Sequence, residues 1–156
     1  MKILIVYYSL SGITKKVVEI FKEKLEKKYS VEIFEIHTEP ELSEKDLRKE
    51  FKIVAYPSVK NFDLIIVGGP VWAFGINYPV LNFLKGLKDI QEKNFILFVT
   101  MGFPFGWMGG NRAIGIMRKI IEEKNGKVEY TFCLNRMFKN ILREAQKIDF
   151  DRLIKT

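Results

Sequence analysis

Short runs of apolar residues recur along the chain. Four of them are rich in β-branched and aromatic residues, namely Ile3–Tyr8, Val31–Ile36, Leu64–Val67 and Phe95–Val99, of which the second, VEIFEI, partly alternates. Such runs are typical of strands that are covered on both faces, as in a parallel sheet. A fifth run, Lys127–Leu134, alternates more between polar and apolar residues. Its pattern predicts a strand at the edge of the sheet.

Between these runs, apolar residues recur every three or four positions, which predicts amphipathic helices. The predicted helices span Thr14–Lys28, Pro79–Leu87, Ala113–Lys124 and Phe138–Lys155. Asn125 follows the third of them and tolerates the left-handed backbone conformation that ends many helices.

The stretch His37–Asn61 has the weakest pattern in the chain. Ser43 and Asp46 resemble a capping box, so we expect a helix from there to about Val54. Pro57 then predicts a loop before the third strand.

The predicted order alternates strand and helix from one end of the chain to the other. This order indicates an α/β fold in which a parallel sheet carries helices on both faces. We expect residues 1–156 to form a single domain. Ligands of such sheets bind outside the carboxyl ends of the strands, which directs attention to the loops after the first, third and fourth strands.

Composition narrows the function classes. The 26 lysine and arginine residues outnumber the 19 aspartate and glutamate residues, so the formal charge is +7. The single cysteine, Cys133, excludes an internal disulfide, and the single histidine, His37, argues against a histidine-based zinc site. We interpret Cys133 as a buried structural thiol and His37 as a surface residue. With no apolar stretch of about 20 residues and no signal peptide, we expect a cytoplasmic protein that does not span a membrane.

The loop after the first strand contains three hydroxyl residues and a glycine, in the order Ser9-Leu10-Ser11-Gly12-Ile13-Thr14. It opens a helix, whose free backbone N–H groups and partial positive charge suit a phosphate. An ordinary helix cap made by Ser11 or Thr14 is the alternative. GxxxxGK[ST] and GxGxxG are absent here, which argues against a P-loop nucleotide site and a Rossmann dinucleotide site.

The pattern SxSGxT in this position resembles the phosphate-binding fingerprint of flavodoxins. The segment from Gly69 to Gly75, GPVWAFG, resembles the loop of that family that carries an aromatic residue against one face of the flavin. The segment from Thr100 to Trp107 occupies the place of the second loop that flanks the ring. The resemblance covers nearly the whole chain. It implies a three-layer flavodoxin-like fold with a five-stranded parallel sheet in the order 2-1-3-4-5, and FMN as the cofactor.

Carried over residue by residue, the resemblance places the phosphate on the first loop and one ring face against Trp72. The other face falls to Trp107, or else to Phe103 or Phe105, and the backbone near Gly75 approaches the flavin N5 atom. It implies no catalytic side chain and no metal site. The implied cofactor-binding residues are Ser9, Leu10, Ser11, Gly12, Ile13, Thr14, Pro70, Val71, Trp72, Ala73, Phe74, Gly75, Thr100, Met101, Gly102, Phe103 and Trp107.

The aromatic residues of the second and third loops support this reading independently, because apolar side chains at a sheet edge mark a binding surface. A small satellite core or a surface for a partner protein is the alternative. The chain departs from the family at Val71, Ala73 and Phe103-Pro104, where threonine, asparagine and an Asp-Gln pair are frequent. Flavodoxins are also usually acidic, whereas this chain is basic.

We therefore expect an electron-transfer flavoprotein, monomeric or homodimeric, whose redox partner has an acidic docking face. A small FMN-dependent oxidoreductase, linked to NAD(P)H, a quinone or a porphyrinogen, is the alternative function. Lysines and glutamates alternate along the helices and no nucleic-acid motif is present, so we expect no nucleic-acid partner.

Overall fold

A parallel sheet forms the centre of the molecule. The computed structural model describes residues 1–43, 50–72, 75–102, 109–135 and 140–154. The main strands are β1 (Lys2–Tyr7), β2 (Ser30–Glu35), β5 (Leu64–Trp72), β7 (Asn94–Met101) and β8 (Lys127–Asn135), in the spatial order β2-β1-β5-β7-β8. All neighbouring pairs are parallel. Numbered along the chain, this is the predicted order 2-1-3-4-5, which is confirmed.

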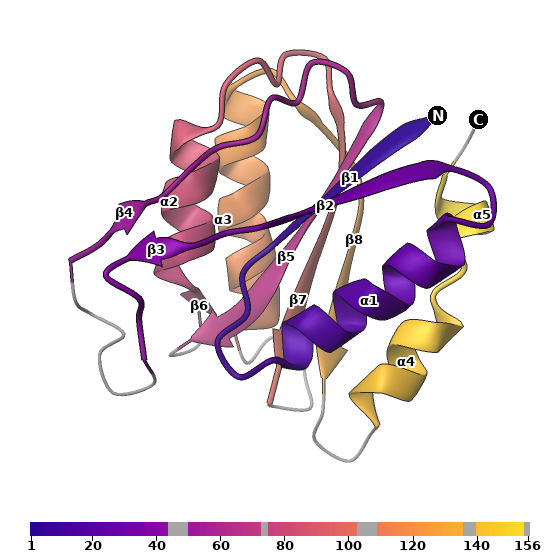
Figure 1. Ribbon diagram of the computed structural model, residues 1–156, viewed down its shortest axis with the longest axis horizontal. Helices are drawn as coiled ribbons and strands as arrows, with labels where there is room; N and C mark the ends of the chain where they lie inside the picture. Colours follow the sequence, from indigo (N-terminus) through magenta and orange to yellow (C-terminus); the bar gives the residue numbers. More distant parts are fainter. Residues whose placement is uncertain (44–49, 73–74, 103–108, 136–139, 155–156) are drawn as a thin grey trace.

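Helices cover the sheet on both faces, which gives three layers (Figure 1). The first group comprises α1 (Ile13–Leu25), α4 (Ile141–Lys147) and α5 (Phe150–Leu153). The second comprises α2 (Tyr78–Gly86) and α3 (Gly110–Glu123). The predicted α/β class is therefore confirmed.

Alternate residues of the central strands feed two separate cores. In β1, Ile3 and Ile5 pack on the side of α1, whereas Leu4 and Val6 pack on the side of α2 and α3. All four are at most 2% exposed. Because both faces are buried, the strand needs apolar residues at every position, which explains the uninterrupted runs in the sequence.

β8 lies at the edge of the sheet, as its alternating pattern predicts. Its exposed and half-buried residues follow one another along most of the strand. An irregularity in register between Phe95 and Ile96 accompanies its pairing with β7. Asn125, just before β8, has a φ of 64°, in the left-handed region expected after α3.

The connection from β2 to β5 differs from the expectation. Two short antiparallel strands occur there, β3 (Thr38–Glu39) and β4 (Lys52–Ile53), where Thr38 pairs with Ile53. The helix expected to run to about Val54 is therefore wrong at its end, and residues 44–49 lie outside the described part. At the end of the expected helix a strand forms instead, because Ile53 packs against the core on the side of α2.

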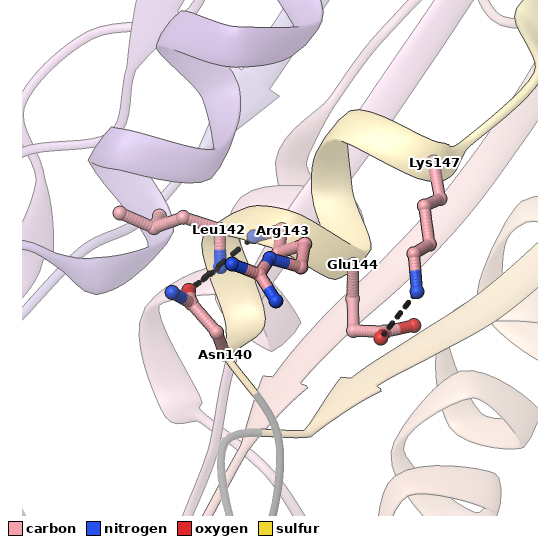
Figure 2. Close-up of polar contacts among 5 residues, drawn as sticks. All are labelled: Asn140, Leu142, Arg143, Glu144 and Lys147. Carbon is pink, nitrogen blue, oxygen red and sulfur yellow. Dashed lines mark hydrogen bonds and ion pairs between the residues drawn. The ribbon is translucent and has the colours of Figure 1, made fainter.

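The predicted C-terminal helix is also wrong in its extent, because the structure has two short helices there. Asn140 starts α4 by accepting bonds from the backbone N–H groups of Leu142 and Arg143, at 3.1 and 3.3 Å (Figure 2). At the other end of α4, the Lys24 ammonium donates to the carbonyl oxygens of Gln146 and Ile148.

Beyond this break the chain turns inward. Asp149 starts α5 by accepting from the backbone N–H of Arg152 at 3.3 Å. Phe150 is then 5% exposed and packs edge-on against Phe21, with 5.0 Å between ring centroids. The break therefore lets an aromatic side chain enter the core beside α1.

Candidate functional site

The ends of β1, β5 and β7 bring the three predicted loops to one edge of the sheet. Tyr7 at the end of β1 pairs with Gly68 of β5, and Pro70 of β5 pairs with Thr100 of β7. The strands are parallel neighbours, so the segments that follow them emerge at the same edge. This edge is the one at which α1 begins (Figure 1).

The first loop is shaped by Gly12 and Ser9. Gly12 precedes α1 with a φ of 90°, a conformation that suits glycine, and a Cβ there would meet no atom within 4 Å. The Ser9 hydroxyl oxygen accepts from the backbone N–H groups of Gly12 and Lys15 at 3.2 and 3.3 Å. Ser9 therefore caps the helix, a role that the sequence left open for Ser11 or Thr14. Its own hydroxyl hydrogen stays available to a ligand.

Several donors of this loop have no acceptor within the part of the chain that the structure describes. They are the backbone N–H groups of Ser11, Ile13 and Thr14. A helix leaves the N–H groups of its first turn without intrahelical partners, and the helix dipole adds a partial positive charge. Open space at Gly12 and N–H groups without described acceptors are the features that suit an anion, so this loop is the candidate anion site.

Thr14 joins this loop to the third one. Its hydroxyl oxygen lies 2.8 Å from that of Thr100, and the two residues are 2% and 4% exposed. The sequence resemblance assigned both residues to the cofactor site. The structure brings them together through their side chains, a contact that sequence reasoning did not foresee.

Of the expected second loop, Gly69 to Trp72 continue strand β5, and the end of this strand places Trp72 beside the first loop. The Trp72 ring packs edge-on against Tyr8, with 5.7 Å between centroids and 80° between planes. Trp72 is half-buried, so part of its indole stays accessible. The following strand β6 (Gly75–Ile76) pairs antiparallel with the end of β5, and Trp72 is opposite Gly75. Ala73 and Phe74, also predicted here, lie outside the described residues.

The helix starts at this edge carry positive charge, whereas the Glu35 and Glu41 carboxylates act on Tyr7 and Tyr8 at the end of β1. The first turns of α1, α2 and α3 contain no acidic residue. Lys15, Lys16 and Arg112 are exposed in the first turns of α1 and α3. Among the described residues, none of the three forms an ion pair. The positive ends of three helices and these cations reinforce one another.

Comparisons with known proteins agree with this geometry at the level of the fold. No protein-family model and no curated protein sequence matches the chain. Solved structures do. Oxidised flavodoxin 2 from Bacillus cereus matches with a TM-score of 0.68 and 18% identity, over 98% of this chain and 97% of that one. A flavoprotein from Lactobacillus acidophilus in complex with FMN matches with a TM-score of 0.61 and 21% identity, over 85% and 92%.

A flavodoxin variant from Fusobacterium nucleatum, bound to flavin mononucleotide, shares 25% identity over 81% of this chain and 66% of that one, with a TM-score of 0.57. This chain has the flavodoxin-like fold. The resemblance read from the sequence is thereby confirmed for the architecture.

Within this flavodoxin-like fold, Asn77 is a residue next to the candidate site that sequence reasoning missed. It is 1% exposed, its amide nitrogen donates to the Pro70 carbonyl at 2.8 Å, and its oxygen accepts from the backbone N–H of Val80 at 2.9 Å. Asn77 thus ties the second loop to the start of α2. Asparagine followed by proline two residues later is a helix-start signal that could have revealed it.

Gly69 makes this attachment possible. A Cβ at Gly69 would lie 2.7 Å from the Asn77 amide nitrogen and 2.8 Å from a Val80 methyl group. Only a residue without a side chain lets the flavodoxin-like sheet approach α2 so closely.

The third loop is described only at its start. Met101 is buried, and Gly102 is exposed with open space where a Cβ would stand. Phe103 and Trp107, predicted to flank the cofactor, lie outside the described residues, as does Phe105. The structure therefore shows the backbone that leads toward these aromatic residues.

A second polar group lies where β1 and β2 end. Burial of Tyr7, reinforced by the Glu35 carboxylate, raises the pKa of its phenol to about 12. His37 Nε2 lies 3.5 Å from a Glu35 oxygen, and the His37 side chain is 58% exposed. The prediction that His37 is a surface residue is confirmed. Cys133 is half-buried, and burial raises the pKa of its thiol.

A cavity of about 660 Å³ lies away from this site, at the amino ends of β5 and β7. Its lining carries both charge signs, with Asp63 and Glu129 as well as Lys147 and Arg152. The donor cluster at the carboxyl edge, in contrast, offers donors of one kind to an anion. We therefore place the candidate site at the carboxyl edge. Among the described residues, no group of side chains is suited to a metal ion, and no helix is long and apolar enough to cross a bilayer.

Proposed function

We propose that this protein binds FMN at the carboxyl edge of its sheet and transfers electrons, as flavodoxins do. The observation that carries the proposal is the start of α1, where the backbone N–H groups of Ser11, Ile13 and Thr14 have no acceptor among the described residues and a Cβ at Gly12 would meet no atom within 4 Å. Two solved structures with the same fold are described as complexes with FMN or flavin mononucleotide.

The residues present fit the phosphate of FMN. A phosphate offers only acceptors when it is fully ionised, and the first loop offers several donors to it: backbone N–H groups, the hydroxyls of Ser9 and Ser11, and a buried threonine hydroxyl. No acidic residue lies in the first turn of α1 to repel the anion.

The ring side of the proposed site is formed by Trp72. An accessible indole can stack on a flat aromatic ring, and the edge-on contact with Tyr8 fixes the plane of that indole. Two contacts hold the backbone around Trp72. Asn77 donates to the Pro70 carbonyl before it, and β6 pairs with Trp72 itself through Gly75. The third-loop residues Phe103, Phe105 and Trp107 remain our candidates for the opposite ring face.

When bound, FMN supplies the redox chemistry. The protein's contribution is to bind the phosphate, orient the ring and exclude water from its faces. Positive charge from Lys15, Lys16 and Arg112 at the same edge favours a negatively charged partner surface. We therefore propose an electron carrier whose redox partner docks through acidic residues.

The test of this proposal begins with the purified protein. We expect it to be yellow, or to become yellow when FMN is added, and to release FMN on denaturation. Under anaerobic conditions, NADH or NADPH should bleach the bound flavin only when a reductase is also present. A colourless protein that takes up no FMN would refute the proposal. If NADH bleaches the flavin directly, the protein is a small FMN-dependent oxidoreductase and not an electron carrier.

A further inference from the structure

We infer that Thr100 is a positioning residue: its buried hydroxyl directs the hydroxyl hydrogen of Thr14 toward the phosphate and so helps the site to distinguish FMN from riboflavin. The inference rests on the proposed function. It concerns a side chain on β7, 86 residues away in sequence from the loop that it acts on.

The contact is well defined in the fold. Thr100 lies near the end of β7, opposite Pro70 of β5, and Thr14 lies in the first turn of α1. Their hydroxyl oxygens are 2.8 Å apart. With exposures of 2% and 4%, neither side chain is free to turn into bulk water.

Counting hydrogens fixes what the pair can do. Each hydroxyl has one hydrogen, and the single bond between the two oxygens uses only one of them. If Thr14 donates, the Thr100 hydrogen needs another acceptor, and the structure gives none among the described residues. If Thr100 donates, the free hydrogen belongs to Thr14, which lies in the same loop and first helical turn as Ser11 and Ile13, whose backbone N–H groups have no acceptor among the described residues.

A phosphate selects the second arrangement. It presents acceptor oxygens, so it favours the state in which Thr100 donates to Thr14 and Thr14 donates to the phosphate. Hydrogen bonds in such a chain polarise one another, and those to charged groups are the stronger ones. Thr100 would thus strengthen phosphate binding without touching the phosphate.

The experiment compares three ligands in equilibrium titrations of the apoprotein: FMN, riboflavin and inorganic phosphate. Thr100→Val removes the hydroxyl and keeps the shape of the side chain. We expect it to weaken FMN and phosphate binding about tenfold, equivalent to ~1.4 kcal/mol, and to leave riboflavin binding nearly unchanged. Thr100→Ser keeps the hydroxyl and should restore FMN binding.

Thr38→Val is the matched control, because Thr38 is also buried, at 6% exposure, and its hydroxyl also makes a hydrogen bond, to the Pro40 carbonyl. This variant should bind all three ligands like the wild type. A double-mutant cycle with Thr14→Val tests the route: once Thr14 lacks its hydroxyl, Thr100→Val should cost little further FMN affinity.

Urea unfolding of each apoprotein, monitored by circular dichroism, shows that the variants fold. If Thr100→Val weakens FMN and riboflavin equally, the threonine pair only braces α1 against β7 and the inference is wrong. Unchanged FMN affinity in this variant would also overturn it. A wild-type protein that binds no FMN would instead refute the proposed function itself.

Discussion

Tyr7 and Tyr8 are neighbours in the chain that face opposite sides of the sheet. Tyr7 packs in the core beside α1, and Tyr8 packs in the core beside α2 and α3, against Trp72. They are 3% and 6% exposed. Burial raises the pKa of both phenols, Tyr7 to about 12, since the charged phenolate is disfavoured away from water.

This shift predicts a loss of stability at high pH. In the unfolded chain Tyr7 loses its proton near its ordinary pKa of 10, whereas in the folded protein it keeps the proton up to about pH 12. Between these values the unfolded state is favoured increasingly, so the free energy of unfolding falls as pH rises, by up to about 2 to 3 kcal/mol from this residue.

Tyr7→Phe should remove this component. Urea unfolding at several pH values between 9 and 12 should show a shallower decline for the variant than for the wild type. Tyr8 contributes to both curves alike, so their difference isolates Tyr7. Parallel curves would show that Tyr7 titrates normally.

Asn77 contributes both to the stability of the fold and to the position of the second loop, because it binds Pro70 and caps α2. Asn77→Ala removes a helix cap and leaves the Pro70 carbonyl without its donor, so we expect a loss of about 2 kcal/mol in unfolding free energy. Because the second loop loosens, FMN affinity should fall as well. Thermal unfolding and FMN titration measure the two effects.

Asn140→Ala serves as the comparison. It removes an exposed cap from α4, on the face of the sheet opposite α2, so it should destabilise the protein by about 1 kcal/mol and leave FMN affinity unchanged. If the two variants lose FMN affinity equally, Asn77 has no specific part in positioning the loop.

At the scale of elements, lysine side chains complete the ends of helices. The Lys124 ammonium donates to the carbonyl oxygens of Leu84, Lys85 and Leu87, at 2.8, 2.6 and 2.8 Å, where α2 ends. Burial lowers the pKa of this ammonium. On the other face of the sheet, the Lys24 ammonium likewise donates to the carbonyl oxygens of Gln146 and Ile148, where α4 ends.

Lys124→Met tests the strength of this cap. The variant keeps the apolar stem and leaves the three carbonyl groups without their donor, so we expect a loss of about 2 kcal/mol in the free energy of unfolding. Urea unfolding measures it. Lys119→Met is the control, since Lys119 is exposed on α3 and should contribute less than about 0.5 kcal/mol. Equal effects in the two variants would refute the capping role.

The sequence predicts those elements whose signal is local. Buried strands require apolar residues at every position, and α1, α2 and α3 show their stripes plainly. The break between α4 and α5 is not local, because Lys24 binds carbonyls 122 and 124 residues further along. The hairpin of β3 and β4 likewise depends on packing of Ile53 against the core.

The same distinction holds within the candidate site. The loop from Ser9 to Thr14 is contiguous, so its order of hydroxyls and glycine identifies it. The partnership of Thr14 with Thr100 and the hold of Asn77 on Pro70 depend on how strands and helices are placed in space. No spacing along the chain encodes them.

At the scale of the whole molecule, part of the formal charge of +7 is concentrated at one edge of the sheet. Three helix starts without acidic residues and three unpaired exposed cations in the described part gather at the edge that carries the candidate site. Such a field attracts anionic reactants and weakens as salt screens it.

We therefore predict that reduced, FMN-loaded protein transfers electrons to ferricyanide at a rate that falls as ionic strength rises. Lys15→Glu combined with Lys16→Glu should lower that rate further. Lys27→Glu combined with Lys119→Glu changes the net charge equally but away from this edge, and should have a smaller effect. Stopped-flow absorbance gives the rates. Equal effects of the two double variants would show that the rate depends on the net charge of the protein and not on where the charges lie.

The most direct measurement is an equilibrium titration of the apoprotein with FMN and with riboflavin, followed by quenching of flavin fluorescence. Our account predicts one FMN per chain. It also predicts riboflavin binding at least about 100-fold weaker, because the anion site at Gly12 gains its charged hydrogen bonds only from the phosphate. Equal affinity for the two flavins, or no saturable binding of FMN, would contradict it.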